Sequence, residues 1–149
     1  MAKESRLSEV HAQILRQHVE IRARMRGIER LAKGGKADAE RHLRVSLAHF
    51  AAIFEEHLAF EERELLPLVT GVDAWGPERV AALLDEHREQ RTRVEKTVAL
   101  AEEGTMRGHE LEGEVHWLMQ SLLDDMLHEE GELRTFEDIE GASTPQMTG

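Results

Sequence analysis

Apolar residues recur along most of the chain at intervals of three and four, the spacing of one face of an α-helix. The pattern is interrupted at glycines and prolines, and no segment alternates apolar and polar residues as a β-strand does. We predict helices over residues 7–32, 38–66, 76–104 and from 105 or 108 to 139, with Ser5 or Ser8 as the first N-cap. The pattern therefore predicts an all-α protein.

Short linkers between helices of similar length favour antiparallel neighbours, so we expect an up-down-up-down antiparallel four-helix bundle. Pro67 and Gly71 are expected to end the second helix near Leu66. We expect a single domain over residues 1–140. Residues 141–149 consist mostly of small and polar residues and are expected to form a disordered C-terminal tail.

Titratable residues interrupt the predicted apolar faces. In the second helix the face continues from Phe54 to His57 and Glu61, and in the fourth helix we place His128 and Glu132 on the buried face. Histidine and glutamate four residues apart point the same way, so each HxxxE pair offers two ligands side by side. Because a buried unpaired carboxylate is costly, such groups pair or bind a metal. A surface ion pair is the simpler explanation for one such motif, but not for two.

Single histidines in the other two helices fall at matching depth. His18 precedes His57 by 39 residues, and His87 precedes His128 by 41. In antiparallel hairpins these separations place each single histidine opposite an HxxxE pair. We therefore predict six metal ligands at one level of the bundle: His18, His57, Glu61, His87, His128 and Glu132. The pattern leaves the roles of His11, His42, His49, His109, His116 and Asp124 open.

These motifs resemble those of the hemerythrin-like (HHE cation-binding) domain family over about residues 8–138, and look most similar to its variant H–HxxxE–H–HxxxE subgroup. The resemblance is carried by His18, by residues 54–62 followed by Leu-Leu-Pro at 65–67, by His87, and by residues 128–132. It implies two non-haem iron ions in the bundle core, presented to dioxygen, hydrogen peroxide or nitric oxide. Glu61 and Glu132 would then bridge the two irons.

Two positions depart from the oxygen-carrying members of that family. Arg91 stands where they have a second histidine in the third helix, and Leu133 stands where they have a bridging aspartate. We therefore expect poor reversible oxygen carriage. Two histidines, two carboxylate oxygens and an oxo or hydroxo bridge leave one open position on each iron. Arg91 is a candidate catalytic residue that steadies a bound peroxide or pairs with Asp124, Asp125 or a ligand glutamate.

Composition limits the possible partners. The formal net charge of −11 disfavours nucleic acid. The absence of cysteine and tyrosine excludes thiol, iron–sulfur and tyrosyl-radical chemistry. No apolar run is long enough for a membrane span or a secretory signal, so we expect a cytoplasmic monomer or weak homodimer without membrane contact.

The leading hypothesis is a di-iron protein that reacts with peroxide or dioxygen. A catalase-like enzyme that removes peroxide is one form of this hypothesis. The alternative is a protein that binds or senses oxygen, nitric oxide or iron without turnover. A metal-free adaptor with a buried ion network and a zinc hydrolase are further alternatives. Ferritin-type iron storage is disfavoured, because those centres use carboxylate-rich ExxH motifs.

Overall fold

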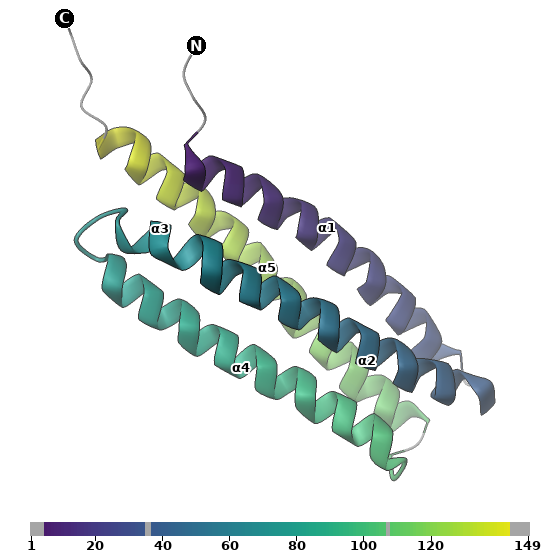
Figure 1. Cartoon of the computed structure of the whole chain (residues 1–149). Coiled ribbons are helices and arrows are strands. Elements are labelled where there is room, and N and C mark those ends of the chain that lie inside the picture. Colours follow the sequence, from purple (N-terminus) through teal and green to yellow (C-terminus); the bar gives the residue numbers. More distant parts are fainter. Residues whose placement is uncertain (1–4, 35–36, 107, 144–149) are drawn as a thin grey trace, which may run out of the picture.

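The computed structural model describes residues 5–34, 37–106 and 108–143. Its elements are α1 (Arg6–Lys33), α2 (Ala37–Phe60), a π-helical turn (Glu61–Leu65), α3 (Leu66–Thr70), α4 (Gly76–Glu103) and α5 (His109–Ser143). The described residues contain no β-strand. Since α2, the π-helical turn and α3 follow one another directly, they form one rod that packs beside α1, α4 and α5 (Figure 1). The predicted all-α four-helix bundle is confirmed.

Most helix ends follow the local sequence signals. The Ser5 side chain accepts a hydrogen bond from the Ser8 backbone N–H (3.0 Å), which fixes the start of α1. Helix α4 begins at Gly76, where a Cβ atom would overlap the backbone of Thr70, so only glycine fits this close approach. It ends at Gly104, whose φ of 66° lies in the left-handed region.

Two predicted boundaries are wrong. The second rod does not end at Leu66 but continues to Thr70. The π-helical turn directly before Pro67 explains this, because it widens the backbone where a proline would otherwise clash with a carbonyl one turn back. Helix α5 includes 141–143, which were expected in the tail. Residues 144–149 lie outside the described residues.

The buried apolar side chains form two clusters along the bundle axis. One contains Ile21, Phe50 and Leu118, and the other contains Leu7 and Phe136. Each rod carries buried polar residues between its contributions to the two clusters. These residues are His18 in α1, His57 and Glu61 in the second rod, His87 and Gln90 in α4, and Glu129 in α5. A polar layer therefore separates two apolar layers.

Within the described ranges, no helix has an apolar stretch long enough to cross a membrane.

Candidate metal centre

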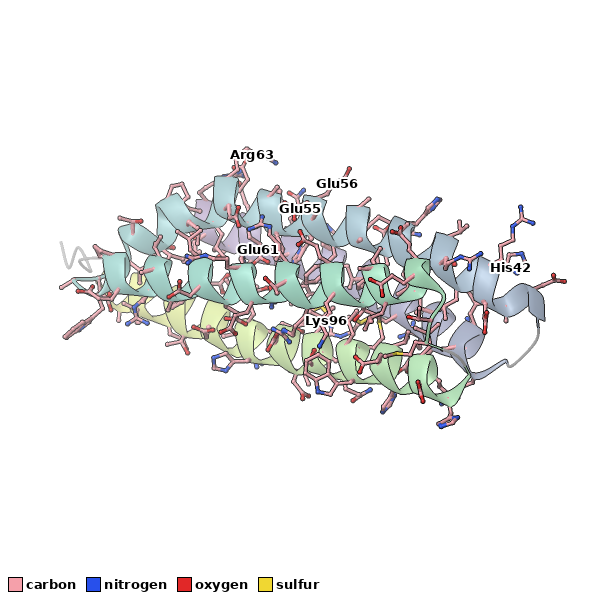
Figure 2. All side chains as sticks on the ribbon, turned by 90° about the horizontal axis from the view of Figure 1, so that it is seen from below. His42, Glu55, Glu56, Glu61, Arg63 and Lys96 are labelled. Atoms are coloured by element: carbon pink, nitrogen blue, oxygen red, sulfur yellow. The ribbon has the colours of Figure 1, made fainter. Side chains whose placement is uncertain are left out.

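Ligand-type side chains from all four rods converge in the polar layer. His18, His57, Glu61 and Glu129 each place a nitrogen or oxygen within 4.8 Å of the others. His87 joins them from α4, with its Nε2 atom 3.8 Å from Glu61 Oε1. We call these five residues the central cluster. Figure 2 shows Glu61 among the helices, whereas Glu56 and Arg63 extend from the outer edge of the bundle.

Hydrogen bonds orient two histidine rings of the central cluster. His57 Nδ1–H donates to Gln17 Oε1 (2.6 Å), and His87 Nδ1–H donates to Glu62 Oε2 (2.8 Å). With Nδ1 protonated, each ring turns the lone pair of its Nε2 atom towards the cluster, where His57 Nε2 lies 2.7 Å from Glu61 Oε1. This is the arrangement found around metal-bound histidines, in which the outer hydrogen bond fixes tautomer and ring orientation.

Several buried atoms of the central cluster lack a hydrogen-bond partner among the described residues. They are both ring nitrogens of His18, Oε2 of Glu61 and Nε2 of His87. The approach of His18 Nε2 to Glu129 Oε1 (3.0 Å) is short, but its geometry does not make a hydrogen bond. Unsatisfied buried polar atoms are unfavourable, and a cation among them would bind Glu61 Oε2, His87 Nε2 and one of the two ring nitrogens of His18. These residues therefore fit a metal ion.

The electrostatics of the central cluster also favour a cation. Burial raises the pKa of Glu61 to about 7. Burial, together with the charge of Glu61, raises the pKa of Glu129 to about 8. Burial lowers the pKa of His57 to about 4, so this imidazole is neutral and can act as a ligand at pH 7. A bound cation would stabilise both glutamates in their ionised form.

A family model also matches this chain. The hemerythrin HHE cation binding domain matches residues 9–136, which include the whole central cluster. The chain belongs to the hemerythrin HHE domain family. No curated protein and no solved structure matches it significantly. The narrower resemblance to the H–HxxxE–H–HxxxE subgroup stays a prediction.

The hemerythrin domain brings together four of the six predicted ligands: His18, His57, Glu61 and His87. The placement of His128 and Glu132 on the buried face of α5 is wrong. The His128 side chain is 71% exposed and lies 3.1 Å from Glu132, whose side chain is 32% exposed. Successive residues turn by about 100° around a helix, so the face that buries Met126 and Leu133 carries Glu129 and directs His128 away.

Sequence reasoning missed Glu129, although an internal repeat marks it. The run Glu61-Glu62-Arg63-Glu64-Leu65 recurs 68 positions later as 129–133, with four of five residues identical. The buried first glutamate of one run corresponds to Glu129 in the other. A shorter repeat, His-x-Glu-x-Arg, occurs at 18–22 and at 87–91. When the two halves of this hemerythrin domain are aligned on both repeats, His18 corresponds to His87 and Glu61 corresponds to Glu129. These are the residues that the structure brings together in the central cluster.

An outer layer of ion pairs supports the single histidines. Arg91 forms two hydrogen bonds with Glu62 (2.8 and 3.0 Å) and two with Glu55 (2.8 and 3.0 Å). Arg22 contacts both oxygens of Glu130 (2.7 and 3.2 Å), which lies 3.5 Å from His18 Nδ1. Arg91 thus lies outside the central cluster and pairs with Glu55 and Glu62, rather than with Asp124, Asp125 or a predicted ligand glutamate.

The other histidines do not join the central cluster. His11 pairs with Glu137 (2.8 Å) and His116 with Glu29 (2.8 Å). The remaining residues whose roles the sequence left open are exposed: His42, His49, His109 and Asp124.

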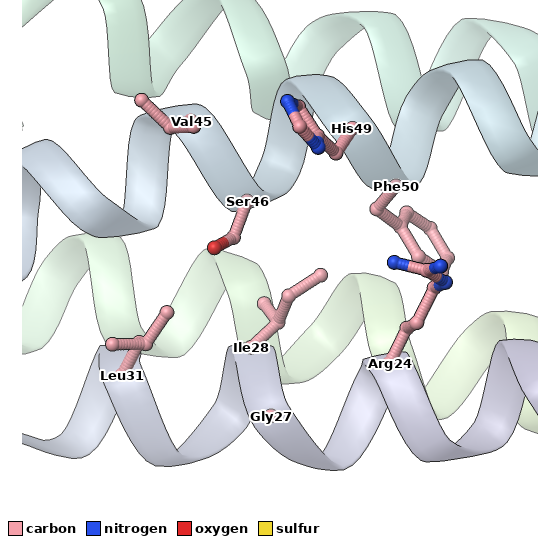
Figure 3. A pocket seen from close by; sticks show the side chains of 8 residues that line it. All are labelled: Arg24, Gly27, Ile28, Leu31, Val45, Ser46, His49 and Phe50. Carbon is pink, nitrogen blue, oxygen red and sulfur yellow. The ribbon is translucent and has the colours of Figure 1, made fainter.

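Two pockets lie along the apolar cluster that contains Ile21, Phe50 and Leu118. One of about 240 Å³ lies between α1 and α2 and is lined in part by Arg24, His49 and Phe50 (Figure 3). Another of about 380 Å³ lies between α2 and α4, and Phe54 and Arg91 contribute to it. The ring centroid of Phe54 is 6.0 Å from that of His57. The second pocket therefore approaches the central cluster to within one side chain.

Proposed function

We propose that this chain is a non-haem iron protein that binds two irons at the central cluster and reacts with hydrogen peroxide or dioxygen. The observation that carries the proposal is the buried convergence of three histidines and two glutamates, in which atoms of His18, Glu61 and His87 lack hydrogen-bond partners among the described residues. Mixed imidazole and carboxylate donors suit iron, and the absence of cysteine excludes a thiolate ligand.

The residues divide naturally between two metal positions. His18 and His57 would supply nitrogens to one position, and His87 would supply a nitrogen to the other. Glu61 and Glu129 would serve both, because a carboxylate has two oxygens and can bridge. Iron held there would supply redox chemistry towards peroxide or dioxygen.

The protein's own contribution is positioning and exclusion of bulk water. Gln17 and Glu62 keep Nε2 of His57 and His87 turned towards the central cluster. Arg91 would act as a positioning residue through Glu62, rather than by touching a substrate. The pocket beside Phe54 offers small molecules a path towards the cluster, while the apolar layers on either side restrict access by water.

Metal loading tests the proposal directly. The purified chain is stripped with a chelator, loaded anaerobically with ferrous iron and desalted, and its iron content and near-ultraviolet absorption in air are measured. We expect bound iron, new absorption and peroxide consumption faster than that of free iron. Absence of bound iron would refute the proposal. Bound iron without peroxide or dioxygen consumption would favour the binding or sensing alternative, and preferential retention of zinc would favour a hydrolase.

A further inference from the structure

The internal repeat aligns each residue of the central cluster with a counterpart in the other half of the chain. Among these residues, only His57 has a counterpart of different chemistry. With the glutamate runs superimposed, His57 corresponds to Asp125. With the His-x-Glu-x-Arg repeats superimposed, Gln17 corresponds to Glu86 and Ile21 to Gln90. The second half of the bundle therefore has an aspartate where the first half has a histidine ligand.

Asp125 is held against α4 by two residues that follow His87 along this helix. Its Oδ2 atom accepts hydrogen bonds from Arg93 Nη2 (2.7 Å) and Gln90 Nε2 (3.2 Å). Gln90 is 6% exposed and lies one helical turn after His87. Both hydrogen bonds engage the same oxygen, so Oδ1 is the atom of Asp125 that a metal would bind.

The surroundings of His87 independently indicate a metal position in the second half of the bundle. Its Nε2 atom is buried and has no hydrogen-bond partner among the described residues, although its Nδ1 atom is fixed by Glu62. A nitrogen held in this way is unfavourable without a ligand. His87 supplies the only nitrogen at this position within the central cluster, whereas His18 and His57 supply two at the other.

We infer that the two metal positions are unequal, and that Asp125 is an oxygen ligand of the weaker one. This inference rests on the proposed iron centre and assigns its second position. The stronger position has two imidazoles and the two central glutamates. The weaker one has His87, the shared glutamates and Asp125, whose charge is partly neutralised by Arg93. Imidazole binds ferrous iron more strongly than a carboxylate already engaged by a guanidinium, so the first equivalent of iron should fill the position of His18 and His57.

Stepwise metal binding by the full chain tests this inference. The metal-free protein is titrated anaerobically with ferrous iron at fixed pH, and bound iron per chain is measured against free iron. We expect the second equivalent to bind at least ~10-fold more weakly than the first. Asp125→His supplies the missing imidazole and should strengthen the second equivalent by at least ~10-fold, so that the two steps merge.

Two further variants keep the test decisive if Asp125→His fails to fold. Asp125→Asn preserves the side-chain shape and should weaken only the second equivalent. His128→Ala is the matched control on the exposed face of α5 and should change neither. Two equal binding steps in the unaltered chain, or an unchanged second step in Asp125→Asn, would overturn the inference while leaving the iron centre standing. Binding of one equivalent only would also contradict the second iron of the proposed function. Failure to bind any iron would instead refute the proposed function.

Discussion

The two Glu-Glu-x-Glu-Leu runs have nearly the same sequence but different backbone geometry. The first, Glu61–Leu65, is a π-helical turn, and the second, at 129–133, is part of the regular helix α5. The buried positions around the first include His57, Glu61, Leu65 and Val69, each four residues apart, and Leu58 and Leu66 are buried beside them. Four-residue steps drift by about 40° each around a regular helix, and a π-helical turn compensates for this drift.

The second run has no such drift to correct. Its buried positions, Met126, Glu129, Leu133 and Phe136, alternate steps of three and four, which a regular helix keeps on one face. In these two runs the backbone geometry differs together with the spacing of the neighbouring core residues, although four of the five residues are identical. This difference suggests where the two runs differ in tolerance to substitution.

The largest expected contrast concerns proline. Thr135 occupies the position in α5 that Pro67 occupies after the first run. Thr135→Pro should lower the free energy of unfolding by about 3 kcal/mol or more, because the regular helix offers no room for the ring. Pro67→Ala should change it by less than about 1 kcal/mol, because the burial of Leu65 and Val69 still requires the π-helical turn. Chemical denaturation measures both, and equal effects would contradict the comparison.

A slightly smaller effect should separate the two glutamates of the second run. Glu129→Gln keeps the side-chain volume but removes a charged ligand, and should weaken iron binding by at least ~100-fold. Glu132→Gln, on the partly exposed face, should leave iron binding unchanged. Iron titration followed by metal analysis distinguishes the variants. Loss of iron from Glu132→Gln alone would restore the originally predicted register of α5.

The metal-free protein should become less stable as pH rises from 6.5 to 8.5. The pKa of Glu61 is raised to about 7 and that of Glu129 to about 8, so their contribution to stability is present at low pH and lost as they ionise. The pKa of His57 is lowered to about 4, so its opposite contribution changes only below pH 6.5. We expect a loss of roughly 2–3 kcal/mol, measured by denaturation in chelator.

Comparison variants assign this pH dependence to particular groups. Glu129→Gln should remove more of the decline between pH 7 and 8.5 than Glu61→Gln, because its pKa is the higher of the two. A metal-free protein whose stability is flat across this range would contradict the shared burial of the two carboxyl groups.

The smallest effect should come from the outer ion pairs. Arg91→Ala frees Glu62, whose hydrogen bond orients His87, and should weaken the iron bound by His87 by about 10-fold. Arg22→Ala should have a weaker effect, because Glu130 lies 3.5 Å from His18 Nδ1 and makes no such hydrogen bond. The stepwise iron titration measures both. A larger loss of iron affinity in Arg22→Ala than in Arg91→Ala would contradict the role of the hydrogen bond between Glu62 and His87.

The sequence predicted the faces of the first two helices well, that of the third in part and that of the fourth poorly. In α1 and in the second rod, most apolar residues lie on one face, so the buried face is unambiguous. This face includes His18, His57 and Glu61. Helix α5 also has large apolar residues on its exposed side, among them Trp117 and Leu127. Apolar spacing was therefore ambiguous there, and the HxxxE motif of His128 selected the wrong face.

Other features depend on contacts that a linear pattern does not contain. The ion pairs of Arg91 with Glu55 and Glu62 link residues on different helices, at separations of 36 and 29 positions. Charged residues on a solvated face are frequent, so no local signal selects these partners. The π-helical turn likewise follows from the burial of Leu65 and Val69 against other rods.

The polar layer also fixes the longitudinal alignment of the helices. Apolar side chains alone tolerate sliding of one helix along another, because leucine, isoleucine and methionine can substitute for one another in a core. A slide of one helical turn, about 5.4 Å, would move Glu61 or Glu129 into an apolar cluster and leave its charge unpaired. Buried polar groups specify alignment in coiled coils in the same way. The residues that would hold the metal therefore also discriminate against misaligned bundles during folding, before any metal binds.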